Sequence, residues 1–221
     1  MEELHVFVSV GGTATPKQEA FVRAVEDRLR SEGLIPQTVG RSKFSSGAPF
    51  KAVIELMDKC SGTVVIALER TYFPTGLEKR GGTNETALSE TKFPTPWNQI
   101  EAAMAYTRGH PLMVIIEEGL RSEGLLERGY DWYVQWVKPE ASALSTLEFN
   151  GILSDWKEKI NQSTSAKKQT DKANRKIDLS DPTIGDLIKG LKPAQLWSIL
   201  VVLAGLIAGA FALGAKLIVI P

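Results

Sequence analysis

The chain has 221 residues, enough for one domain of ordinary size and an appendage. Its 26 basic and 26 acidic residues give a formal net charge of zero, so no nucleic-acid partner is expected. The single cysteine, Cys60, excludes an intrachain disulfide framework and a cysteine-cluster metal site. The two histidines, His5 and His110, lie far apart in sequence, and we therefore expect no metal site.

The chain begins with the pattern of a strand followed by a helix. The acidic start before Leu4–Val10 predicts no signal peptide, and that run is rich in β-branched and aromatic residues. Thr15 is a suitable N-cap, and Pro16 suits the first helical position. Gly33 then predicts the end of the helix.

The next elements continue the alternation of strand and helix. Residues 34–39 predict a short second strand, and residues 49–59 predict a helix. Residues 63–68 are apolar throughout, which indicates a central parallel strand. Residues 70–94 have mixed polarity and are predicted to form a long loop.

A third helix is predicted where Thr95 and Pro96 repeat the capping pattern. The residues that we expect to face the core are Ile100, Ala103 and Met104. The apolar run at 112–116 predicts the fourth strand, and residues 130–137 predict a fifth. A last amphipathic helix is expected to close the domain near Gln162.

Glu101 is the unusual residue of the third helix. It lies within the run IEAAMA, where an unpaired carboxylate would be costly and where small neighbours leave room for a ligand. The alternative is a half-exposed glutamate with an ion-pair partner, and the sequence leaves both interpretations open.

This alternation predicts an α/β, flavodoxin-like fold, in which a parallel sheet carries helices on both faces. Ligands of such sheets bind beyond the carboxyl ends of the strands. Glu101 belongs to a helix that begins at this edge, where the helix N-terminus favours anionic groups such as phosphate.

The spacing Trp97-x-x-x-Glu101, followed by Gly109-His110-Pro111 and an apolar run, resembles the helix of bacterial TIR domains that carries the catalytic glutamate. The run IEAAMA is also similar to the nucleoside 2-deoxyribosyltransferase-like superfamily. The resemblance covers residues 4–160. It implies a TIR-like domain at 1–162 that cleaves the N-glycosidic bond of NAD or a related nucleotide, with Glu101 as the catalytic carboxylate.

The resemblance also directs attention to residues near that edge of the sheet. Gly11 and Gly12 lack a Cβ, so their backbone, with that of Thr13, could approach the substrate closely. Arg41 and Lys43 are candidates to bind the phosphate of the substrate. Phe44 is a candidate to stack on its base, and Trp97 to form a wall of the site. For each of them, a loop or packing role is the alternative.

The C-terminal part has a different composition. Residues 163–192 predict a basic linker, and residues 196–215 contain no charge over 20 positions. A transmembrane helix is therefore expected at 193–217 as a single-pass C-terminal anchor. The basic residues before it place the N-terminal domain on the cytoplasmic side of the cell inner membrane.

Two functions from different classes remain open. The first is a membrane-anchored hydrolase, for which the resemblance alone implies a role in antiphage defence and NAD or another nucleotide as the substrate, without a cofactor. The second is a non-enzymatic module at the membrane that senses a nucleotide or pairs TIR domains. Both imply contact with lipid, and a GxxxG pattern at Gly205 and Gly209 is consistent with a homo-oligomer.

Overall fold

A five-stranded parallel sheet forms the centre of the computed structural model, which describes residues 3–129 and 131–175. The strand order is β2-β1-β3-β6-β7, and every neighbouring pair is parallel. This order is that of flavodoxin-like folds, so the predicted α/β fold with a parallel sheet is confirmed. The strands are β1 (Leu4–Val10), β2 (Leu34–Gln37), β3 (Thr63–Ala67), β6 (Leu112–Glu117) and β7 (Tyr133–Val137).

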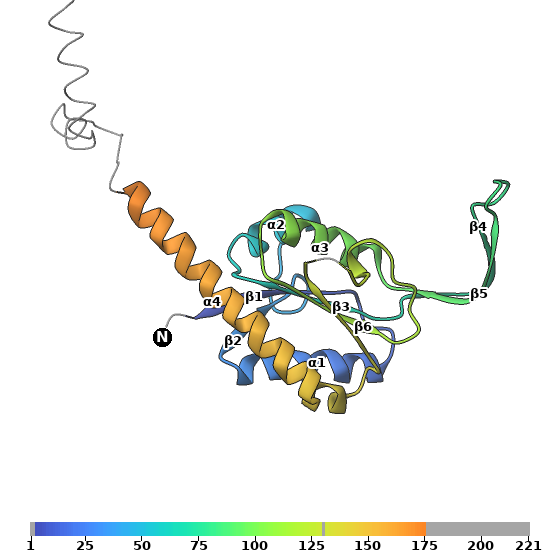
Figure 1. Cartoon of the computed structure of the whole chain (residues 1–221), viewed down its shortest axis with the longest axis horizontal. Helices are drawn as coiled ribbons and strands as arrows, with labels where there is room; N and C mark the ends of the chain where they lie inside the picture. Colours follow the sequence, from blue (N-terminus) through green and yellow to red (C-terminus); the bar gives the residue numbers. More distant parts are fainter. Residues whose placement is uncertain (1–2, 130, 176–221) are drawn as a thin grey trace, which may run out of the picture. The chain divides into compact units, whose positions relative to one another are not determined.

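Helices cover both faces of the sheet (Figure 1). On one face lie α1 (Pro16–Ser31) and the first turns of α4 (Leu147–Arg175), and on the other lie α2 (Pro49–Met57) and α3 (Pro96–Thr107). Alternate residues of β1 supply both layers, because successive side chains of a strand point to opposite faces. The short 3₁₀ helices are η1 (Gly124–Leu126) and η2 (Ala141–Ser145).

The predicted helix ends are confirmed at α1 and α3. The Thr15 side chain accepts a hydrogen bond from the Gln18 N–H at 3.2 Å, and Thr95 accepts one from the Trp97 N–H at 3.4 Å. Gly33 follows the last turn of α1 with a φ of 78°, which a residue without Cβ adopts at little cost.

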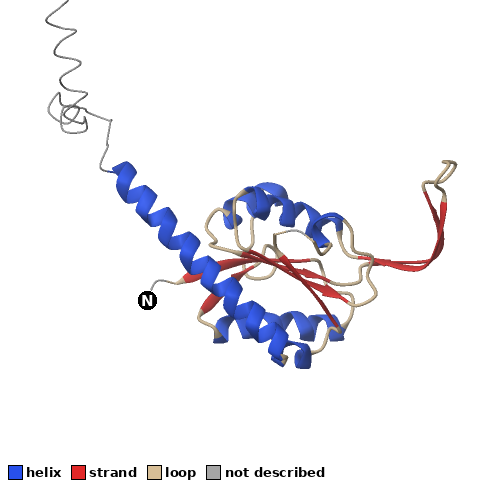
Figure 2. Ribbon diagram, in the orientation of Figure 1, coloured by secondary structure: helices blue, strands red, loops and turns tan. Residues whose placement is uncertain are grey.

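The prediction of a long loop at 70–94 was wrong. These residues form an antiparallel hairpin of β4 (Thr71–Glu78) and β5 (Thr86–Phe93), which projects from the body of the domain (Figures 1 and 2). Cross-strand contacts stabilise the hairpin. In one of them the rings of Phe73 and Phe93 pack edge to face, with their centroids 5.8 Å apart. Because most of its side chains are exposed, the hairpin lacks the alternating burial pattern that marks a strand in sequence.

The predicted inward face of α3 was also wrong at Ile100, whose side chain is 40% exposed. The buried residues of α3 are Asn98, Glu101, Ala102 and Ala105. Polar residues can occupy this face because hydrogen bonds replace their lost hydration.

The last described helix extends past the end predicted near Gln162. α4 continues to Arg175, and the first compact unit of the chain ends at Lys168. Residues 163–175 contain neither Gly nor Pro, so nothing in their sequence ends the helix. The rest of the predicted linker and the predicted anchor at 193–217 lie outside the described residues. Within the described residues, no helix is long and apolar enough to span a membrane.

Candidate active site

The candidate site lies where the strand order of the sheet reverses, between β1 and β3. Crevices at this point, beyond the carboxyl ends of the strands, are where flavodoxin-like folds bind ligands. Helix α3 packs over both strands and carries Glu101 toward them. The fold thus places the predicted catalytic carboxylate at the layer between α3 and the centre of the sheet.

Three polar side chains meet in this layer, and we call Ser9, Asn98 and Glu101 the buried polar cluster. Their exposed fractions are 0%, 1% and 8%. The Asn98 side-chain amide donates to the Ser9 hydroxyl at 3.0 Å, and more weakly to the carbonyl oxygens of Ser9 and Ile66, both at 3.4 Å. The Ser9 hydroxyl also hydrogen-bonds the Glu101 carboxyl group. Since Ser9 accepts from Asn98, its own proton is available to Glu101.

Burial raises the pKa of Glu101 to about 7, and the hydrogen bond from Ser9 only partly opposes this rise. None of the described ion pairs includes Glu101. The alternative of a half-exposed glutamate with a cationic partner was therefore wrong. A carboxyl group with a pKa near neutrality can exist in either protonation state under physiological conditions, as acid–base and nucleophilic roles require.

A small cleft adjoins this cluster at the sheet edge. Its lining includes the predicted residues Gly11, Gly12 and Thr13 together with Asn98, but not Glu101. Its volume of about 10 Å³ is enough for about one water molecule. A Cβ at Gly11 would lie 2.9 Å from the methyl carbon of Thr95, so glycine allows this loop to touch the start of α3.

Arg41, a predicted phosphate ligand, is held by carboxylates of α1. Its guanidinium donates two hydrogen bonds to Glu19, at 2.9 and 3.1 Å, and one to Glu26 at 3.1 Å. Hydrogen bonds to Glu19 lower its pKa to about 2, and the bond from Arg41 has a larger effect than the one from Arg23. In this arrangement Arg41 fastens the segment after β2 to α1.

Replacing Arg41 by alanine is expected to lower the free energy of unfolding by about 1–3 kcal/mol, because partly buried carboxylates lose their charged partner. Chemical denaturation of the purified protein measures this loss. Arg23→Ala is the matched control, since Arg23 contacts the same Glu19 but is 70% exposed, and it should cost less than about 1 kcal/mol. Unchanged stability with lost nucleotide binding would instead identify Arg41 as a ligand of phosphate.

The three remaining predicted residues lie outside the cleft beside Asn98. Lys43 is exposed, and its carbonyl accepts from the Gly40 N–H at 2.7 Å. Phe44 is 82% exposed and Trp97 is 40% exposed. Their predicted contacts with substrate therefore stay predictions.

Sequence reasoning missed Ser9 and Asn98. Asn98 precedes Glu101 by three residues, so both lie on one face of α3, and this spacing was a usable signal. Ser9 is a polar residue near the otherwise apolar end of β1. Because it lies inside a run that predicts a strand, the sequence offered no reason to consider it separately.

A larger cavity of about 310 Å³ lies at the opposite edge, beside the first residues of β6 and β7. Its walls include Tyr106, His110, Trp132 and Trp156, and none of the predicted site residues. The His110 ring there hydrogen-bonds the Thr63 hydroxyl at 3.1 Å. Among the residues that the structure describes, no three metal-ligating side chains gather at either edge.

Comparison with known proteins gives no family: no family model matches the chain, and no curated protein matches it.

Proposed function

We propose that this chain is a membrane-anchored TIR-like domain that cleaves the N-glycosidic bond of NAD or a related nucleotide, with Glu101 as its catalytic carboxylate. The observation that supports this most is the burial of Glu101, without a cationic partner among the described residues, at the reversal point of a parallel sheet. Burial at that point gives one carboxyl group both a raised pKa and a position beside a ligand-binding edge.

The proposed chemistry follows from the charge that glycosidic cleavage creates. The bond between the anomeric carbon and the base nitrogen breaks, and the base departs with the bonding electrons. The sugar becomes oxocarbenium-like, and an ionised Glu101 stabilises it or bonds to it covalently before water adds. The hydrogen bond from Ser9 favours the ionised carboxylate, and Asn98 orients the Ser9 hydroxyl.

The direct test is to incubate the purified full-length protein with NAD and with other nucleotides, and to identify products by mass spectrometry. Cleavage of NAD would yield nicotinamide and ADP-ribose. If no nucleotide in the panel releases its base in the presence of the membrane fraction and lipid, the enzymatic proposal fails.

The proposed anchor is residues 193–217, and the proposed setting is antiphage defence at the cell inner membrane, with the N-terminal domain in the cytoplasm. Cell fractionation with and without residues 193–221 tests the anchor, since only the complete chain should pellet with membranes. Protease added to intact spheroplasts should leave the N-terminal domain whole. Its digestion would reverse the proposed orientation.

A non-enzymatic interaction module at the membrane is the second candidate, and two observations favour it. Glu101 does not line the cleft at the sheet edge. Helix α3 also displays apolar side chains to solvent, at Trp97, Ile100 and Tyr106. Such a module would form homo-oligomers whose assembly, measured by light scattering, is unaffected by Glu101→Gln but weakened by Trp97→Ala.

A further inference from the structure

Arg70 occupies the mouth of the small cleft, between the end of β3 and the start of β4. Its guanidinium donates to the Gly12 carbonyl oxygen at 3.1 Å, and both residues line the cleft. Its backbone is fixed, because the Arg70 N–H donates to the Phe93 carbonyl at 2.9 Å. The backbone hydrogen bond therefore holds Arg70 at the mouth of the cleft.

Arg70 differs from three other cations of the domain in its bonding partners: each of the three contacts a carboxylate. Arg41 is held by Glu19 and Glu26, Lys92 is 2.6 Å from Glu69, and Arg121 is 2.6 Å from Glu78. Within the described part of the chain, Arg70 forms no ion pair, and its side chain bonds only to a neutral carbonyl. Exchange of that carbonyl for an anion would replace a hydrogen bond to a neutral acceptor by one between opposite charges.

The backbone beside Arg70 offers further donors. Within residues 3–129 and 131–175, no acceptor bonds to the N–H groups of Gly12 and Thr13. These N–H groups belong to the loop that Arg70 contacts at Gly12, so both could donate to an anion bound beside the guanidinium. Glu69 also lines this cleft, and its pairing with Lys92 at 2.6 Å offsets the negative charge that would oppose an anion there.

We propose that Arg70 is the phosphate-binding residue of this site and that its ligand is a nucleotide carrying a diphosphate. The guanidinium leaves the Gly12 carbonyl, opens the mouth of the cleft and binds the diphosphate together with the loop N–H groups. The identification of the ligand as a nucleotide rests on the proposed function. The anion site itself rests on the contacts of Arg70 and of the Gly11–Thr13 loop.

The test is isothermal titration of the full-length protein in detergent with three probes: ADP, inorganic pyrophosphate and adenosine. For the wild type, ADP and pyrophosphate should bind, and adenosine should bind more weakly than ADP. Arg70→Ala should weaken ADP binding by about 10- to 100-fold, because a charge-assisted hydrogen bond is lost, and should leave adenosine unchanged. Arg70→Gln retains a donor for Gly12 without the charge, and should lose ADP equally.

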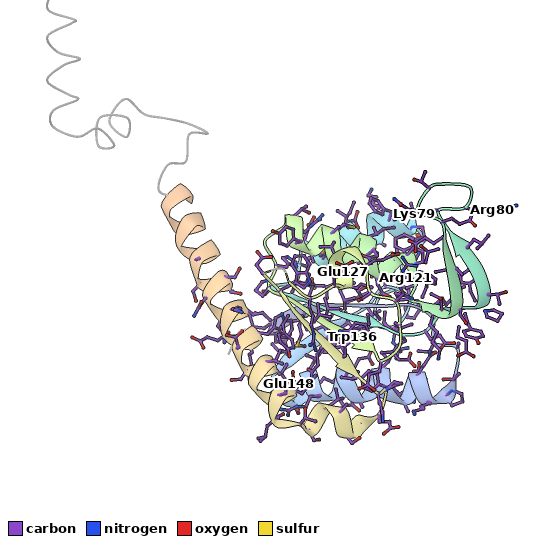
Figure 3. All side chains as sticks on the ribbon, turned by 45° about the vertical axis from the view of Figure 1, so that its right-hand side comes forward. Lys79, Arg80, Arg121, Glu127, Trp136 and Glu148 are labelled. Atoms are coloured by element: carbon purple, nitrogen blue, oxygen red, sulfur yellow. The ribbon has the colours of Figure 1, made fainter. Side chains whose placement is uncertain are left out.

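Arg80→Ala is the matched control, because Arg80 lies at the far end of the same hairpin (Figure 3). It should bind ADP as the wild type does. The proposal is overturned if neither ADP nor pyrophosphate binds, if Arg70→Ala binds ADP within twofold of the wild type, or if Arg80→Ala loses as much.

These binding measurements can be told apart from the test of NAD cleavage, because each proposal can fail without the other. If NAD is never cleaved but ADP binding depends on Arg70, the proposed function fails and the anion site stands. If NAD is cleaved with the same KM by the wild type and by Arg70→Ala, the function stands and the anion site fails.

Discussion

The Glu101→Gln variant is expected to cleave nucleotide at least about a thousandfold more slowly than the wild type, with little change in KM. Glutamine retains the volume of the side chain and an oxygen that can accept from Ser9, but it carries no charge and is no nucleophile. Removing a preorganised charge from a water-excluded site typically costs two to three orders of magnitude, and loss of a nucleophile costs more. Single-turnover measurement of base release from NAD determines the ratio.

The matched control is Glu55→Gln on α2. Glu55 is 58% exposed and lies 3.7 Å from Lys51, so removing its charge should leave turnover within about twofold. Full activity of Glu101→Gln would contradict the assignment. Glu69 and Glu117 would then need testing, although Glu69 already pairs with Lys92 at 2.6 Å and Glu117 accepts from the Glu69 N–H at 2.8 Å.

The sheet was predictable because its strands are buried on both faces. A run such as β3, with all five residues buried, has to be apolar throughout, and that pattern is readable without a structure. The N-caps Thr15 and Thr95 were predictable for a local reason as well, since each bonds an N–H within three residues of itself. A strand that is buried along its whole length and a cap that bonds a nearby residue can therefore both be predicted from sequence.

The meeting of Ser9 with Asn98 and Glu101 depends on contacts between distant residues, whereas the β4–β5 hairpin is local and was missed because its exposed side chains leave no alternating burial pattern. Ser9 and Asn98 are 89 residues apart, and nothing near either one indicates that they meet. Arg41 was predicted to bind phosphate because an arginine in a loop at the ligand edge suits that role. Only the fold shows that Glu19 and Glu26, about two turns apart on α1, already pair with it.

The remaining prediction concerns the pH dependence of stability. Between about pH 4.5 and 7, the free energy of unfolding of the wild type is expected to fall relative to that of Glu101→Gln. Burial raises the pKa of Glu101 from 4.5 in the unfolded chain to about 7 in the folded one. In this interval the folded state holds a proton that the unfolded state has lost, so stability decreases as pH rises.

The full difference across this interval is about 3 kcal/mol, at 1.36 kcal/mol for each pKa unit. Urea denaturation of both proteins at pH 4.5, 5.5, 6.5 and 7.5 measures it, and subtracting one protein from the other removes the contributions of the groups that the two proteins share. Acidic groups with lowered pKa values, such as Glu19, occur in both proteins, so their contribution near pH 4.5 cancels in this difference.

Ser9→Ala provides an internal check on the same linkage. The Ser9 hydroxyl is the group that lowers the pKa of Glu101 against the effect of burial, so its removal should raise that pKa further and extend the fall in stability to higher pH. A flat difference between the wild type and Glu101→Gln would mean that Glu101 ionises normally and is solvated. The carboxylate would then lack the desolvation on which its proposed catalytic role depends.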